Sequence, residues 1–363
     1  MRPRLLPFVP RALRTPFALL CSAFLALGCG PEFDPPSEIV GLRVLGVQKD
    51  QPYAQPNQDV ELSLLYHDGI AGDQAAPRPI SIAWLTGCWN PPADSYAGCF
   101  VQFASGDLGA VGLEFGNRVS LRTKPAPIQP RPAPNPDYDL GYVFFAVCAG
   151  TISLDTESGE GLPIRCRDES GRDLGSKDFV VGFTAIYVFA DRSDGTPYQN
   201  QNPAVTGFSL GGRALSQEQS CVGDACLAAC TEVGCEQPQV SEVNCEEEGA
   251  PCLPRCKEDG DPIDCPGYDI RPLYSLAMPA EPDQVSNDTY GRSNTEQMWI
   301  NYYATRGAVK SDARLLNDAT KQYNRDFGTE FYAPSTPGPV RVWAVVHDNR
   351  GGMSWAGATL YIQ

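Results

Sequence analysis

The sequence is short of basic residues and of histidine. It contains 28 Lys and Arg against 44 Asp and Glu, and its formal net charge is −16. Coulomb repulsion opposes an approach to nucleic acid or to anionic lipid headgroups, so we expect no nucleic-acid partner. The two histidines, His67 and His347, lie far apart in the chain. Neither has a second histidine within three or four residues, which excludes a local histidine metal motif.

The N-terminal apolar run is too short to cross a membrane. Phe17–Gly28 are apolar or small, whereas a spanning helix needs roughly 20 such residues. The residues before this run include Arg2, Arg4, Arg11 and Arg14 but no acidic residue. A basic segment followed by a short apolar one is typical of a secretory signal peptide, which we predict over residues 1–28.

The apolar run ends in Ala26-Leu27-Gly28-Cys29, which resembles the lipobox of bacterial lipoproteins. The resemblance implies that Cys29 carries lipid, such as palmitate, and anchors the mature chain in a membrane leaflet. Gly30 instead of Asp favours the outer membrane and leaves open whether the protein faces the periplasm or the cell surface. Residues 29–38 are rich in Pro and acid, and we expect them to form an extended tether.

The sequence has no CxxC pair and no histidine near its cysteines, which argues against structural zinc and favours disulfides. Without Cys21 and Cys29, twelve of the 14 cysteines remain, an even number. Cys88 with Cys99 and Cys148 with Cys166 suggest local pairs. The other eight form a cysteine-rich insertion at residues 221–265, and sequence leaves their 105 connectivities open; they are Cys221, Cys226, Cys230, Cys235, Cys245, Cys252, Cys256 and Cys265.

Long amphipathic helices are also missing, and β-branched or alternating runs separated by turn residues take their place. Strand after strand without intervening helices favours antiparallel β-sandwiches over a parallel α/β sheet. We therefore predict a mainly β chain with two immunoglobulin-like sandwich domains, at residues 39–195 and 200–363, the second carrying the insertion. The expected strands are residues 39–48, 59–66, 80–86, 141–149, 179–190, 202–212, 268–278, 298–305, 312–318, 339–349 and 354–362.

A serine hydrolase is the catalytic alternative. Gly207-Phe208-Ser209-Leu210-Gly211 matches GxSxG, and Asp312 and His347 follow in the order of an α/β-hydrolase triad. That motif needs a strand-to-helix turn in a parallel sheet, and the chain shows no alternating βα pattern. We therefore interpret Ser209 as part of a strand, His67 as an exposed turn residue beside Asp68-Gly69, and His347 as capping a sheet edge. We predict no catalytic residues.

Acidic turns suggest calcium as another alternative. Calcium prefers carboxylate and carbonyl oxygens on loops, and several aspartates lie in turn-rich segments. The spacing does not match an EF-hand, so solvated turns explain these positions equally well. We predict no cofactor and no metal site, with calcium-dependent adhesion left open; the aspartates are Asp191, Asp194, Asp259, Asp261 and Asp264.

Several segments together resemble a group of uncharacterised myxobacterial-type cell-envelope lipoproteins with immunoglobulin-like domains. They are IVGLRVLGV near the mature N-terminus, NPAVTGFSLGG in mid-chain, and WINYYATRG and YAPSTPGPVRVWAVVHDNRGG near the end. The resemblance implies an envelope location and a sandwich fold, but it implies no activity. We expect a non-catalytic structural or binding module whose loops contact a protein or a glycan.

Overall fold

The computed structural model describes residues 36–363 except 71–77, 106–111, 155–163, 228, 232–233, 237–243, 248, 258–263, 276–279 and 322. The predicted signal peptide and Cys29 lie outside the described residues. Residues 36–363 form one compact unit. The chain is mainly β, as predicted, and none of the helices that the structure describes combines the length and apolarity needed to cross a bilayer.

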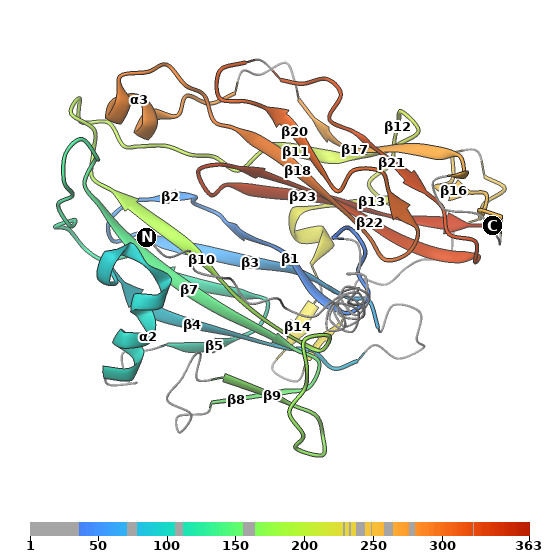
Figure 1. Ribbon diagram of the computed structural model, residues 1–363, viewed down its shortest axis with the longest axis horizontal. Coiled ribbons are helices and arrows are strands. Elements are labelled where there is room, and N and C mark those ends of the chain that lie inside the picture. The colour runs from blue at the N-terminus through green and yellow to red at the C-terminus, as the bar shows by residue number, and fades with distance from the viewer. Residues whose placement is uncertain are drawn as a thin grey trace, which may run out of the picture. The chain divides into compact units, whose positions relative to one another are not determined.

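Strands between residues 42 and 189 form two sheets, drawn in blue to green in Figure 1. The first sheet has the order β1-β3-β6, with β1 (Leu42–Lys49), β3 (Asp59–Asp68) and β6 (Arg118–Arg122). The second has the order β2-β10-β7-β4-β5, with β2 (Tyr53–Ala54), β10 (Phe179–Phe189), β7 (Tyr138–Cys148), β4 (Ser81–Trp89) and β5 (Leu113–Phe115). Neighbouring strands are antiparallel except β2 and β10, which run parallel.

The two sheets enclose one apolar core and so form a sandwich. Because side chains alternate along a strand, Leu62 and Leu64 of β3 face inward together and pack with Trp84 and Phe145 from the opposite sheet. Trp84 is fully buried, and its Nε1 donates a hydrogen bond to the Gly116 carbonyl (2.8 Å). The indole is therefore both packed and hydrogen-bonded, as a buried tryptophan requires.

Part of the outer face of the β10–β7–β4 sheet is covered by small elements. These are the 3-10 helix η2 (Pro92–Asp94), helix α2 (Tyr96–Ser105) and the hairpin of β8 (Thr151–Leu154) and β9 (Ile164–Arg167). Cys99 of α2 and Ile152 of β8 pack with Phe144 of β7. The segment between Cys88 and Cys99 therefore includes η2 and the start of α2, and neither helix was predicted from the sequence.

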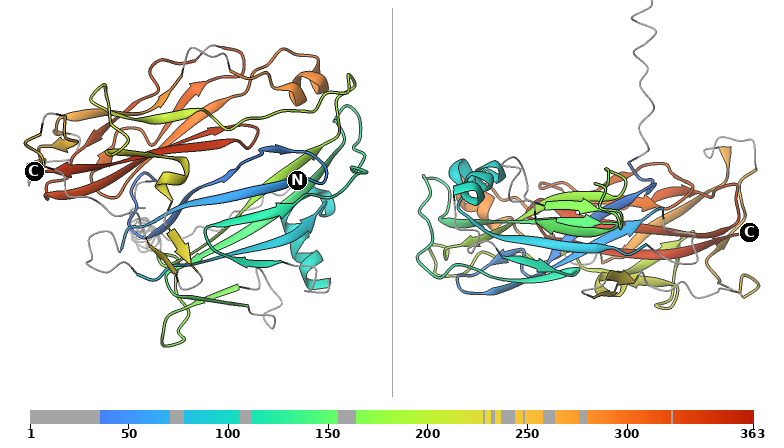
Figure 2. Two further views of the ribbon diagram at one scale, coloured as in Figure 1. Left: turned by 180° about the vertical axis from the view of Figure 1, so that it is seen from behind. Right: turned by 90° about the horizontal axis from the view of Figure 1, so that it is seen from below.

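Strands between residues 205 and 362 form a second pair of sheets, shown from two further sides in Figure 2. One has the order β12-β11-β17-β21-β19: β12 (Arg213–Ala214), β11 (Val205–Leu210), β17 (Gly267–Tyr274), β21 (Thr329–Tyr332) and β19 (Ala308–Val309). The other has the order β13-β23-β22-β18-β20: β13 (Ser220–Val222), β23 (Met353–Ile362), β22 (Gly338–Asp348), β18 (Met298–Ala304) and β20 (Ala313–Asn317).

The core of this second sandwich joins Phe208 and Phe331 of one sheet to Ile300 and Val342 of the other. Helix α3 (Gln284–Tyr290) precedes β18, and its N-cap Asp283 accepts a hydrogen bond from the Ser286 amide (3.0 Å). The cysteine-rich insertion adds the 3-10 helix η4 (Gly223–Cys226), the β14 (Ala229–Thr231) and β15 (Gly234–Glu236) pair, and β16 (Cys252–Leu253), which pairs with β23.

A further apolar cluster joins the two sandwiches. Trp343 of β22 and Trp355 of β23 point away from their own core and pack with Leu45 of β1 and Leu65 of β3. Gln48 reinforces the contact, because its Nε2 donates a hydrogen bond to the Met353 carbonyl (2.7 Å). The outer face of β22 and β23 is therefore covered by the first sandwich.

Every expected strand has a counterpart in the structure, with ends that differ by a few residues. The positions of the two histidines were predicted wrongly. His67 lies within β3, is only 3% exposed, and its ring centroid is 4.8 Å from that of Trp343. His347 lies in β22, which is a central strand between β23 and β18 and not a sheet edge. The domain boundaries and the immunoglobulin-like classification stay predictions.

Candidate functional site

A pocket of about 510 Å³ opens where β10 and β7 meet the turn between β22 and β23. Its apolar wall includes five aromatic side chains: Tyr53, Tyr138, Phe183, Tyr187 and Phe189. The polar and charged residues that line it are Lys49, Asn135, Thr184, Asn349 and Arg350. Mostly apolar walls with a few polar groups are typical of small-molecule sites, and this volume lies within their usual range.

Strand alternation explains why the rings gather on one side. Ile186 and Val188 of β10 point into the sandwich core, so Phe183, Tyr187 and Phe189 point to the outer face. Tyr138 of β7 lies opposite Phe189 in the antiparallel register, and Tyr53 of β2 lies beside Tyr187. The sheet therefore presents aromatic side chains from three adjacent strands on one face.

The rings contact one another closely. The Tyr53 and Phe189 centroids lie 4.7 Å apart in an edge-to-face arrangement, and Tyr187 and Phe189 are stacked at 5.9 Å. The Arg131 guanidinium lies 3.9 Å from the Tyr138 ring centroid and pairs with Asp94 (2.6 Å). These contacts hold the rings in place before any ligand arrives, which reduces the entropy lost on binding.

Lys49, the last residue of β1, places its ammonium in the wall of the pocket. The side chain is 5% exposed, and Nζ donates one hydrogen bond, to the Ala185 carbonyl (3.0 Å). Burial lowers the pKa of Lys49 to about 8, while the nearby Asp348 carboxylate opposes that shift. Gly351 has a φ of +91°, and a Cβ there would lie 3.0 Å from Nζ. A glycine at this turn therefore permits the close approach of Lys49.

The β22–β23 turn is held by a buried ionic network. The Arg350 Nη2 atom lies 2.8 Å from carboxylate oxygens of both Glu281 and Glu296. Its Nη1 donates to the carbonyls of Gln199 (3.2 Å) and Pro282 (3.1 Å). Burial raises the pKa of Glu296, an effect that Arg350 opposes. Arg350 is therefore a structural cation whose charge two carboxylates balance, while its Nε is buried without a hydrogen-bond partner among the described residues.

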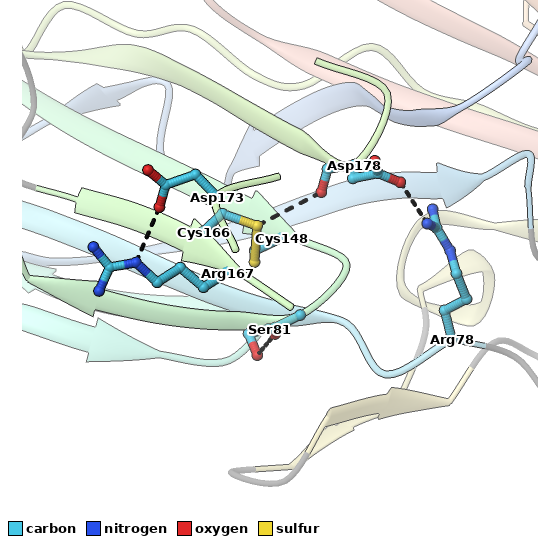
Figure 3. The surroundings of a disulfide bond; sticks show 8 residues. Arg78, Ser81, Cys148, Cys166, Arg167, Asp173 and Asp178 are labelled. Atoms are coloured by element: carbon cyan, nitrogen blue, oxygen red, sulfur yellow. Dashed lines mark hydrogen bonds and ion pairs between the residues drawn. A yellow bond between two sulfur atoms is a disulfide. The ribbon is translucent and has the colours of Figure 1, made fainter. Parts of the chain in front are cut away.

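The two predicted local disulfides are present, Cys88–Cys99 and Cys148–Cys166. Figure 3 shows the second, which links the end of β7 to β9. Near it the Arg78 guanidinium pairs with Asp178 (2.5 Å), and Arg167 pairs with Asp173 (3.0 Å). The disulfide thus fixes the β8–β9 hairpin over the outer face of the sheet.

Three further disulfides establish part of the cysteine connectivity in the cysteine-rich insertion. The bonds join neighbours in sequence: Cys221–Cys226, Cys245–Cys252 and Cys256–Cys265. Cys230 and Cys235 lie opposite each other in the β14–β15 register. Five disulfides in the described residues indicate an oxidising, extracytoplasmic location.

The three residues of the hydrolase alternative are not brought together. Phe208 and Leu210 point into the core of the second sandwich, so Ser209, between them in β11, points to the opposite face. His347 points outward from the other sheet, where its ring stacks on Trp299 at 5.2 Å. Burial lowers the pKa of His347 to about 4. Asp312 precedes β20, and its carbonyl accepts a hydrogen bond from the Tyr302 amide (2.8 Å).

The acidic turns that suggested calcium show ordinary turn contacts. Asp194 accepts hydrogen bonds from the Thr196 amide (2.9 Å) and hydroxyl (2.6 Å). Asp191 is exposed on the same loop, Asp264 is exposed in the insertion, and Asp259 and Asp261 lie outside the described residues. Within the part of the chain that the structure describes, no group of three or more His, Cys, Asp or Glu side chains is placed to hold a metal ion.

The pocket was not predicted from the sequence. One signal was present in β10, where Phe183, Tyr187 and Phe189 share one face of the strand while the other face is also apolar. A strand that is apolar on both faces needs a cover or a ligand on its second face. Lys49 gave no signal, because a lysine at the end of an apolar strand is usually exposed.

Comparisons with known proteins add no family. No protein-family model matches the chain, and no curated protein does. Among solved structures, latent PorU from Porphyromonas gingivalis aligns with 90% of this chain and 24% of its own at 9% identity, with a TM-score of 0.16. The N-terminal domains of the bacteriophage RB49 outer capsid protein Hoc align with 89% of this chain and 99% of theirs, again at 9% identity and a TM-score of 0.16. Scores this low support no argument about fold or function.

Proposed function

We propose that the protein is a non-catalytic, lipid-anchored module of the cell envelope that binds a glycan in the aromatic pocket. The pocket is the observation that carries the proposal. The faces of a sugar ring expose C–H groups that pack on aromatic rings, and its hydroxyls need hydrogen-bonding partners. Tyr187 and the exposed Phe183 offer the first kind of surface, and Asn349 and Thr184 offer the second.

The anchor at Cys29 and an outer-membrane location complete this proposal. The mature chain would begin at a lipid-modified Cys29 and reach its folded part through a short tether. The disulfides support an extracytoplasmic site of action, where envelope glycans occur. Intact mass of the membrane-extracted protein tests the anchor, because lipidation of Cys29 adds the mass of its acyl chains.

The glycan-binding proposal is tested with a panel of envelope oligosaccharides and titration calorimetry. Tyr187→Ala removes a central ring of the pocket, and we expect it to weaken binding at least about tenfold. Phe115→Ala is the matched control, because Phe115 is an exposed aromatic on β5 at the opposite edge of the same sheet. Equal affinity of the Tyr187→Ala variant and the wild type would contradict the proposal.

A further inference from the structure

The pocket contains two cations, and neighbouring carboxylates already balance the charge of one of them, Arg350. Arg350 gives its terminal nitrogens to Glu281, Glu296 and two carbonyls. Lys49 has three N–H donors as an ammonium, and among the described residues its Nζ has one acceptor, the Ala185 carbonyl. The positive charge that the pocket can offer to a ligand is therefore that of Lys49.

The Asp348 carboxylate acts on Lys49 through its charge, but no ion pair or hydrogen bond joins the two among the residues that the structure describes. Its Oδ1 accepts hydrogen bonds from the amides of Arg350 (2.7 Å) and Gly352 (2.8 Å), and its Oδ2 is buried without a hydrogen-bond partner in the described part of the chain. A Lys ammonium that is 5% exposed is costly without a directly bonded anionic partner. A ligand carboxylate that enters the pocket would supply that partner and would form charge-assisted hydrogen bonds.

We propose that the glycan taken by this pocket is acidic, with the carboxylate of a uronic acid bound to the Lys49 ammonium and its ring packed on Tyr187. This inference rests on the proposed glycan-binding function and narrows it to one class of sugar. The matched ligands are uronic acids and their neutral counterparts, which differ by a carboxylate in place of a hydroxymethyl group.

Several charged and titratable groups surround Lys49. Asp348 and Arg350 come from the β22–β23 turn, Tyr53 from β2, Tyr138 from β7 and Tyr187 from β10. Burial raises the pKa of each of these three tyrosines above its ordinary value of 10, and the acidic partners of Arg350 raise its pKa. The pKa of Lys49 is about 8, so the side chain loses its charge as the pH rises from 7 to 9.5. A preference for uronic acids that depends on this charge must therefore weaken over the same range.

The test measures affinity by NMR titration for glucuronate against glucose and for galacturonate against galactose, each as monomer and trimer. At pH 7 we expect the acidic member of each pair to bind at least about tenfold more tightly. Lys49→Met should abolish this preference while neutral sugars still bind. Lys321→Met is the control, because that lysine is on an exposed turn, where it pairs with Asp318.

The outcomes separate this inference from the proposed function. Equal binding of acidic and neutral sugars, both weakened by Tyr187→Ala, would overturn the inference and leave glycan binding intact. Failure of every sugar to bind would overturn both. If Lys49→Met does not fold, wild-type protein still decides the matter: a uronate preference that persists unchanged at pH 9.5 contradicts the role of Lys49.

Discussion

The two sandwiches differ in what happens to the aromatic residues on their outer faces. On β22 and β23, Trp343 and Trp355 point away from their own core and are buried against β1 and β3. On β10, Phe183 also points outward but stays 44% exposed, beside a pocket. An outward aromatic residue therefore does not by itself indicate a binding site. What distinguishes the two faces is whether another part of the chain covers them.

The largest effect should come from the covered face. Trp355 is fully buried, and its Nε1 donates a hydrogen bond to the Gly223 carbonyl (2.7 Å). Trp355→Ala removes that bond and leaves a cavity between the sandwiches. We expect a loss of about 3–5 kcal/mol of unfolding free energy, measured by denaturant titration. A loss below about 1 kcal/mol would mean that the covered face contributes little to stability.

A loss of similar size is expected at the turn that forms one side of the pocket. Arg350→Leu leaves the buried Glu296 without its cation, and breaking a buried pair costs about 3–5 kcal/mol at neutral pH. Burial raises the pKa of Glu296 in the folded state, so folding favours its protonated form. The destabilisation should therefore shrink as the pH falls from 7 towards the ordinary glutamate pKa of 4.5. Thermal unfolding of variant and wild type at pH 4 and pH 7 measures this difference.

A smaller effect is expected where the first sandwich covers part of its own outer face. The Cys148–Cys166 disulfide holds β9 beside β7. Replacing both cysteines by alanine should lower the unfolding free energy by about 2–4 kcal/mol. Hydrogen exchange should show faster opening of β8 and β9 but unchanged protection in β22 and β23. An equal loss of hydrogen-exchange protection in β22 and β23 would contradict the claim that the outer faces of the two sandwiches are covered independently.

The smallest effect should come from the exposed face. Phe183 stacks on Tyr96 at 4.5 Å, yet both residues stay nearly half exposed. Phe183→Ala should therefore change the unfolding free energy by no more than about 1 kcal/mol, measured by the same denaturant titration. A loss as large as that of Trp355→Ala would show that the two faces do not differ.

Much of the fold could be predicted from the sequence, because it depends on local patterns. Alternation and turn residues located strands such as β3 and β22, and the spacing of Cys148 and Cys166 suggested their bond. Helix α2 was missed because its short, aromatic-rich segment lacks a clear helical period. His67 was misplaced because the residue that buries it, Trp343, lies in the other sandwich. Burial by a distant segment leaves no local signal.

The candidate site could not be predicted for the same reason. Its side chains come from β1, β2, β7, β10 and the β22–β23 turn, so they meet only after both sandwiches have formed. The candidate that sequence did suggest, Ser209 with Asp312 and His347, depended on a motif without its structural context. Strand alternation places Ser209 and His347 on outer faces of opposite sheets.

Chemical-shift mapping with an envelope oligosaccharide tests the central claim most directly, because it reports both aromatic faces in one experiment. We predict that the ring signals of Tyr53, Tyr187 and Phe189 shift on titration, whereas the indole signals of Trp343 and Trp355 stay unchanged. Shifts at the two tryptophans without shifts at the pocket rings would contradict the account.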